Sequence, residues 1–339
     1  MEKLIDTSEN SQTDKNRSYN NNGLVIVIGP SIMVLDYIYS SLKNKGFGFC
    51  AMDINTSYLD NSHLPPSDLL YLYTRNEEDL NLLSSVDIQT LELPTIPLIK
   101  SKIQDSDGEV VYILVYLGDD FSNRTVFEAA KAGKELGRIV VCIIAMPPKW
   151  EGIQNTIRAN NAFAGLKPFV DASFVFYRDI FDEDESEIFD DFFSPLEIST
   201  HTFKMPFDAI YRIINQQGEI VIDASDVKAL LKSGAFSAVG TGQCTLPDRM
   251  SIMLEQVLDS PFFHYLNKEK CTLILLSFEA SEQNAIRMEE IEEFTNLMRQ
   301  QFGEEVDFII GLKKDNTLGE LAKVVCLFSF SEHEILSNL

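Results

Sequence analysis

Residues Val110 to Met146 read VVYILVYLGDDFSNRTVFEAAKAGKELGRIVVCIIAM, and this stretch decides the fold. It begins with a continuous apolar run, Val110 to Tyr116, which is typical of a strand buried on both faces. A short polar loop, Gly118 to Arg124, leads into a helical segment that ends at Gly137. A second apolar run, Ile139 to Ile144, completes a β-loop-α-β unit and predicts a parallel sheet.

The loop of this unit is expected at the carboxyl edge of the sheet, facing a helix N-terminus, where open α/β folds bind phosphates. A phosphate cradle needs glycines and often a lysine, so that backbone N–H groups can converge on the anion. This loop has one glycine, Gly118, followed by Asp119 and Asp120. Each carboxylate close to a phosphate costs roughly 1–4 kcal/mol. The loop therefore has the position of a nucleotide site but a composition that opposes a nucleotide.

Composition restricts the class of protein. The chain has 339 residues, enough for two domains, and 45% of them are hydrophobic. Its net charge of −24 argues against nucleic acid and anionic membranes as partners. Five scattered cysteines indicate reduced core residues of a cytoplasmic protein and have no metal-ligand spacing. No apolar run reaches the length that spans a bilayer.

The N-terminal half contains a second β-loop-α-β unit. Residues 1–22 are polar and are predicted to form a disordered tail. A strand at Leu24–Ile28, a helix at Ile32–Leu42 and a strand at Phe49–Ile54 follow, again with a glycine-poor loop. Leu91–Ile99, which contains two prolines, is interpreted as a loop.

Beyond Met146 the pattern predicts a helix at Ile153–Leu166 and an acidic loop that begins at Asp182. Residues 192–216 suit a long helix that Pro206 is expected to kink or interrupt. A smaller α/β domain with a mixed sheet is then expected. Its predicted helices are Val227–Lys232, Asp248–Leu258 and Met288–Phe302, and its predicted strands are Ala235–Gly242, Thr272–Ser277, Val306–Leu312 and Lys323–Phe330.

From about Leu24 to Ser329 this order of elements resembles FtsZ, the bacterial homologue of tubulin. The matching residues, in family order and spacing, are Lys134–Gly137, Pro147, Glu151–Gly152, Val170–Asp171, Asp179, Gly218, Asp223, Asp226–Val227, Gly240, Gly242, Asp248–Arg249 and Phe308–Gly311. The resemblance implies an α/β fold of the FtsZ/tubulin type. It implies a Rossmann-type nucleotide-binding domain at 23–180, an acidic loop and central helix at 181–218, a C-terminal domain at 219–331 and a short tail at 332–339.

The departures from FtsZ are concentrated where that family binds GTP. Its first glycine-rich loop corresponds to residues 29–33, where only Gly29 remains, and its GGGTGTG signature corresponds to residues 118–124. The family's arginine after Glu151–Gly152 is replaced here by Asn155, and its asparagine before Asp179 is replaced by Arg178. Its base-reading Asn–Asp pair corresponds to residues 200–201. The resemblance places the following residues in the degenerate pocket: Gly29, Gly118, Asp119, Asp120, Ser122, Asn123, Glu151, Asn155 and Arg178. We therefore expect neither GTP nor GDP as a cofactor.

Asp223 and Asp226 match a catalytic segment of FtsZ that projects into the nucleotide site of the next subunit. There, by the resemblance, they would orient the attacking water. The alternative is that both carboxylates cap the helix beginning near Val227. Of the remaining polar residues, Arg124 is expected to pair with Asp119 or Asp120. Trp150 is expected to pack at the domain junction.

Three functions follow from these observations. The first is an FtsZ-like pseudo-GTPase that associates with or regulates cytoskeletal filaments in cell division. The second is a divergent GTPase that still binds GTP and polymerises, and the third is an acidic scaffold that holds a basic protein. The expected partner is FtsZ itself or a second copy arranged head to tail, with no nucleic acid and no direct membrane anchor. Repulsion between Asp119 and Asp120 on one face and Asp223 and Asp226 on the other favours FtsZ over self-association.

Overall fold

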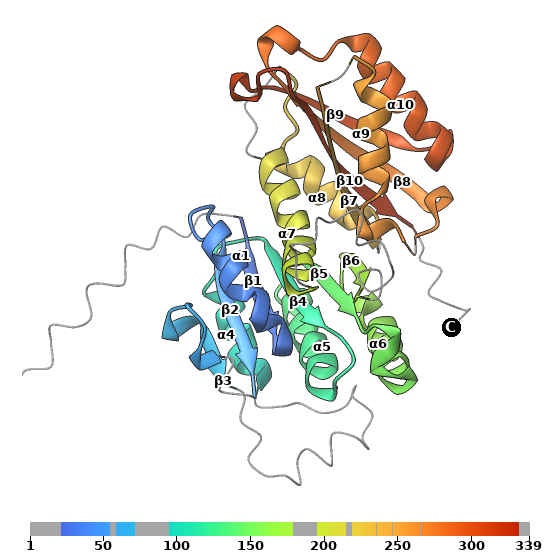
Figure 1. The fold of residues 1–339 in the computed structure, drawn as a ribbon. Coiled ribbons are helices and arrows are strands. Elements are labelled where there is room, and N and C mark those ends of the chain that lie inside the picture. Colours follow the sequence, from blue (N-terminus) through green and yellow to red (C-terminus); the bar gives the residue numbers. More distant parts are fainter. Residues whose placement is uncertain are drawn as a thin grey trace, which may run out of the picture.

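The computed structural model describes residues 22–54, 59–71, 95–178, 195–214, 219–234, 236–245, 247–264 and 266–331. In this part of the chain, one ten-stranded sheet runs through the molecule in the order β3-β2-β1-β4-β5-β6-β7-β10-β8-β9 (Figure 1). Its strands are β1 Leu24–Ile28, β2 Gly48–Asp53, β3 Leu69–Tyr71, β4 Val110–Tyr116, β5 Ile139–Met146, β6 Ala172–Tyr177, β7 Phe236–Cys244, β8 Cys271–Ala280, β9 Asp307–Lys314 and β10 Ala322–Phe330.

The first six strands of this order are parallel. All residues of β1, β4 and β5 are buried, as their continuous apolar sequences require. The order 3-2-1-4-5-6 is the Rossmann order, in which ligands bind outside the carboxyl ends of the strands near β1 and β4. The helices of this half are α1 Leu35–Leu42, α4 Thr95–Gln104, α5 Asp120–Glu135 and α6 Ile153–Leu166.

The second half continues the same sheet through a narrow joint. Strands β6 and β7 share only two register pairs, Ser173↔Phe236 and Phe174↔Ser237. Beyond the joint, β10 is antiparallel to β7 and β8, whereas β8 and β9 are parallel, so the sheet is mixed. The helices here are α7 Pro195–Ile214, α8 Ala224–Ser233, α9 Arg249–Leu258 and α10 Met288–Phe302. The predicted fold class, a parallel sheet, a central helix and a smaller mixed α/β half, is confirmed.

Two glycines set the spacing between α9 and β7. A Cβ atom at Gly240 would lie 2.4 Å from the carbonyl oxygen of Val257, and one at Gly242 would lie 2.3 Å from that of Met253. Any larger residue would push the helix off the strand. The alternating glycines are therefore a packing requirement of this half.

Two predictions about prolines need correction. Pro206 does not interrupt the helix, because α7 runs unbroken from Pro195 to Ile214, whereas a kink at Pro206 stays a prediction. The proline removes one helical hydrogen bond, but the deeply buried side chains of Phe203, Phe207 and Ile210 hold the flanking turns in place. Residues 95–99, interpreted as part of a loop, begin helix α4, since Pro97 stands in its first turn, where the missing N–H costs nothing.

Several predictions lie outside the described residues, namely those for most of the N-terminal tail, the acidic run from Asp182 and the C-terminal tail. The domain bounds also stay predictions, because the sheet is continuous across them. In the part of the chain that the structure describes, no helix is both long and apolar enough to cross a membrane.

Candidate functional site

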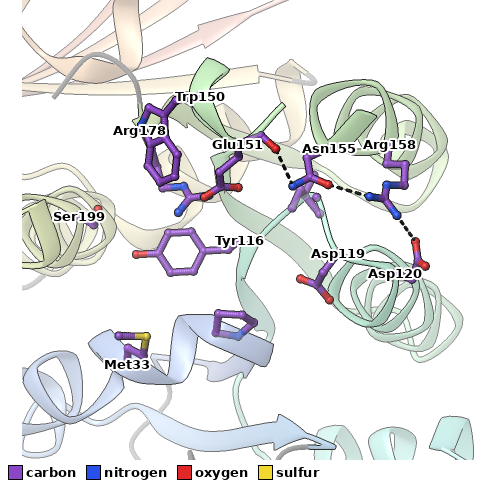
Figure 2. A pocket seen from close by; sticks show the side chains of 13 residues that line it. Met33, Tyr116, Asp119, Asp120, Trp150, Glu151, Asn155, Arg158, Arg178 and Ser199 are labelled. Carbon is purple, nitrogen blue, oxygen red and sulfur yellow. Dashed lines mark hydrogen bonds and ion pairs between the residues drawn. The ribbon is translucent and has the colours of Figure 1, made fainter. Parts of the chain in front are cut away.

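A pocket of about 650 Å³ opens at the carboxyl ends of the parallel strands (Figure 2). Pro30 follows β1, the segment from Tyr116 to Asp120 ends β4, Glu151 follows β5 and Arg178 follows β6. The pocket therefore occupies the position that the strand order assigns to a ligand. The lining residues are Pro30, Met33, Tyr116, Leu117, Gly118, Asp119, Asp120, Trp150, Glu151, Asn155, Arg158, Arg178 and Ser199.

The loop between β4 and α5 uses its own backbone donors. The N–H of Gly118 donates to Oδ1 of Asn123 at 3.0 Å. The N–H of Ser122 donates to Oδ1 of Asp119 at 2.8 Å, so Asp119 is the N-cap of α5. The N–H of Ser122 is in the first turn of α5, where a helix can bind an anion, and that of Gly118 lies just before the N-cap. Here they already have partners within the chain.

The loop after β1 packs directly against the start of α5. It begins as a short 3-10 helix, η1 Gly29–Val34, in which Gly29 has a φ of +59°. A Cβ atom at Gly29 would lie 2.6 Å from Oγ of Ser122, a fully buried side chain. The hydroxyl of Ser31 accepts a hydrogen bond from the N–H of Tyr116 at 2.8 Å. The segment after β1 is therefore bonded to the end of β4 and packs closely against the first turn of α5.

A chain of polar contacts crosses the far wall of the pocket. Arg178 pairs with Glu151 at 2.5 Å, and its guanidinium lies 5.1 Å from the ring centre of Tyr116. On α6, Nη2 of Arg158 donates to Oδ1 of Asn155 at 2.7 Å, and Nη1 lies 3.5 Å from Oδ1 of Asp120. Figure 2 shows this second set linking α6 to the start of α5. The charges that line the pocket largely compensate one another.

Burial dominates the ionisation of Tyr116. It raises the pKa of the hydroxyl, although a hydrogen bond with Ser199 and the nearby charge of Arg178 act in the opposite direction. The hydroxyl is therefore neutral near pH 7, and the ring contributes an aromatic wall rather than a charge.

Two further predictions were wrong. Arg124 pairs with Glu128, with Nε 3.0 Å from Oε1, rather than with Asp119 or Asp120. The pair is buried one turn inside α5, and Asp119 is already engaged as the N-cap. Trp150 is 70% exposed, so it lines the mouth of the pocket instead of packing at the domain junction.

Six of the thirteen lining residues were predicted from the sequence, and seven were not: Pro30, Met33, Tyr116, Leu117, Trp150, Arg158 and Ser199. Of the predicted residues, Gly118, Asp119, Asp120, Glu151, Asn155 and Arg178 line the pocket. Gly29 lies in the segment after β1, and Ser122 and Asn123 lie in the first turn of α5, behind the pocket. Helical spacing offered a signal for Arg158, which stands three residues after Asn155 and therefore on the same side of α6.

Asp223 and Asp226 lie apart from this pocket, beyond the C-terminal end of α7. Helix α7 rises by roughly 20 Å between Ser199, which lines the pocket, and its end at Ile214. Oδ1 of Asp223 accepts from the N–H groups of Ser225 and Asp226, and Oδ2 of Asp226 accepts from the N–H of Asp223. This capping box confirms the capping alternative. A catalytic role between subunits stays a prediction.

Two curated relatives are similar to this chain in sequence, at low identity. Cell division protein FtsZ 1 of Thermococcus kodakarensis is 22% identical over 219 residues, which are 64% of this chain and 57% of that protein. Cell division protein FtsZ of Porphyromonas gingivalis is 22% identical over 332 residues, which are 93% of this chain and 69% of that protein. No family model matches the chain.

Among solved structures, a GTPγS-form protofilament of TubZ from Bacillus thuringiensis serovar israelensis superposes with a TM-score of 0.72 at 14% identity. The superposition covers 94% of this chain and 89% of that one. Fold and pocket position thus define an α/β protein with the architecture of the filament-forming nucleotide-binding proteins. Together with the curated relatives, they support a divergent member of the FtsZ/tubulin superfamily.

Proposed function

We propose that this protein is a pseudo-GTPase: an FtsZ-like cytoskeletal protein that does not bind GTP or GDP and acts through contacts with filaments. The main support is the closed loop between β4 and α5, where Asn123 and Asp119 occupy the N–H groups of Gly118 and Ser122. A phosphate would have to displace both side chains. It would also approach the Asp119 carboxylate, which already occupies the helix N-terminus with a negative charge.

Intrinsic fluorescence offers a direct test, because Trp150 is the only tryptophan and lines the pocket mouth. The protein is titrated with GTP and Mg²⁺ while Trp150 emission is recorded, and calorimetry is run in parallel. We expect no saturable change and no heat of binding at micromolar nucleotide. A Trp150→Phe variant controls for absorption of the exciting light by the nucleotide. Saturable micromolar binding in both measurements would show that the protein is not a pseudo-GTPase.

One observation favours a second candidate, a divergent GTPase with an altered binding mode. The pocket has room for a ligand, and the aromatic rings of Tyr116 and Trp150 and the cations Arg158 and Arg178 line it. A nucleotide could stack on these rings without using the glycine-rich loops. In that case GTP would quench Trp150, and Arg158→Ala would weaken the effect. The same titration therefore separates the two candidates.

The association with filaments draws support from the fold and from the names of the relatives, which are cell division proteins. In this proposal the protein uses FtsZ or its own copies as partners.

A further inference from the structure

Helix α6 carries an exposed stripe of mostly apolar residues along its outer side. Ile153 is 68% exposed, and Ile157, Asn161 and Ala164 are exposed as well. These four residues follow one another at intervals of four, four and three, so they form one line along the helix. We call them the α6 stripe. Figure 1 shows α6 at the outer edge of the parallel half, where a second molecule can reach it.

The same helix lacks the negative charge of the rest of the chain. Asp and Glu make up 52 of the 339 residues, yet none occurs between Gly152 and Val170. The charged residues of that segment are Arg158 and Lys167, and Nη1 of Arg158 lies 3.5 Å from Oδ1 of Asp120. With a net charge of −24, two copies of this protein repel one another over most approaches. Along α6 they can meet without opposing carboxylates.

The α6 stripe is complementary to itself when two copies of the helix lie antiparallel. Its large side chains, Ile153 and Ile157, stand in the first half, and the small Ala164 stands near the end. With a two-fold axis near the middle of the helix, Ile157 faces Asn161 of the second copy, and Ile153 faces its Ala164. Each isoleucine thus meets a smaller side chain, so the two helices can pack closely.

We propose that two copies of the protein form a symmetric dimer by packing their α6 stripes antiparallel. Apolar side chains supply the centre of the contact. Lys167 at the end of one helix then lies near Glu151 at the start of the other, which adds an attraction at both ends. The contact is isologous and closes on itself, so it gives dimers and not filaments. It is independent of the proposed loss of nucleotide binding.

The size of the contact predicts a reversible dimer. Each copy contributes one helix of 14 residues, which is about 21 Å long. An interface of this extent belongs to the small, transient class. We therefore expect monomers in dilute solution and dimers in concentrated solution, and sedimentation velocity of the full chain over a wide range of concentrations measures the change.

Two substitutions in the stripe test which surface forms the dimer. Ile157→Asp places a carboxylate beside the two-fold axis, and Ala164→Arg fills the space that faces Ile153. Each should weaken dimerisation at least tenfold, because a charge must then be buried in the contact. Leu98→Asp, a matched change at an exposed position on α4, should dimerise like the unaltered protein. Urea denaturation checks that all three variants stay folded.

Cross-linking tests the antiparallel arrangement. All five natural cysteines are buried, so a cysteine introduced on the stripe is the accessible thiol. Ile157→Cys and Asn161→Cys are oxidised separately and as a mixture. The antiparallel contact predicts that the mixed disulfide forms fastest, whereas a parallel contact would join each variant to itself.

Three results would overturn the proposal. They are a protein that sediments as a monomer at every concentration, a dimer that survives both stripe substitutions, and a mixed disulfide that forms no faster than the two like pairs.

Discussion

The carboxylate of Asp119 accepts a hydrogen bond from the backbone N–H of Ser122 at 2.8 Å, at the first turn of the helix that faces the pocket. In this position a side chain of the protein provides the negative charge that a helix N-terminus attracts. The same contact stabilises α5 and opposes a phosphate. A change that favoured phosphate would therefore reduce the stability of the protein.

Asp119→Ala removes this cap, and we expect the free energy of unfolding to fall by about 1 kcal/mol. Urea denaturation followed by circular dichroism measures the difference. Asp120→Ala is the matched control, because its carboxylate makes only an exposed pair with Arg158, worth less than about 1 kcal/mol. Equal losses in the two variants would contradict the assignment of Asp119 as the cap.

The fold could be predicted because long apolar runs determine it. The run Val110–Tyr116 coincides with β4, and the amphipathic pattern Met288–Phe302 coincides with α10. The interruption predicted at Pro206 is absent, because local propensity does not include the tertiary packing of α7. Buried aromatic neighbours compensate for a single lost hydrogen bond.

The site was predictable in composition but not in contacts. The loss of glycines at residues 29–33 and 118–124 could be recognised from the sequence. The pairing of Arg124 with Glu128 could not, because it depends on which side of α5 faces inward. The exposure of Trp150 could not be predicted either, because an apolar residue that follows two prolines can lie at a domain junction or on the protein surface.

Arg249 and Glu290 form a two-point ion pair between α9 and α10, with contacts of 2.7 and 2.8 Å. Partial burial alone would raise the pKa of Glu290, but hydrogen bonds from Arg249 and from the N–H of Arg287 lower it overall. We expect Glu290→Gln to lower the free energy of unfolding by about 2 kcal/mol at pH 7. Glu289→Gln, an exposed neighbour, should change it by less than about 0.5 kcal/mol.

The pH dependence of this pair has a definite sign. Because the pKa of Glu290 is lowered in the folded state, its contribution is present above the ordinary value of 4.5 and is lost as the pH falls through the lowered value. The difference between the unaltered protein and Glu290→Gln should therefore shrink between about pH 5 and pH 3. A difference that grew on acidification would contradict the proposed origin of the shift.

The cysteines should be unreactive in the folded protein. All five are buried and none forms a disulfide, and burial raises the pKa of Cys50 and of Cys271 to about 12. Reaction with a thiol reagent requires the thiolate and access to it. We expect negligible release of chromophore from the native protein at pH 8 and five equivalents after unfolding in guanidinium. Rapid reaction of one equivalent in the native state would reveal an accessible thiol.

Asp223 makes the most direct connection between the fold and a partner, because its carboxylate caps α8 and is also exposed. If this carboxylate engages FtsZ, adding the protein to FtsZ from the same cell should change FtsZ sedimentation and GTP turnover. Asp223→Ala and Asp226→Ala should abolish the change, but each also weakens the capping box.

Asp223→Ser resolves the ambiguity, because serine caps a helix about as well as aspartate yet carries no charge. A docking role predicts that Asp223→Ser unfolds at the same urea concentration as the unaltered protein but has no effect on FtsZ. If Asp223→Ser affects FtsZ as the unaltered protein does, the carboxylate serves only the helix. If the unaltered protein changes neither readout, this face does not bind FtsZ.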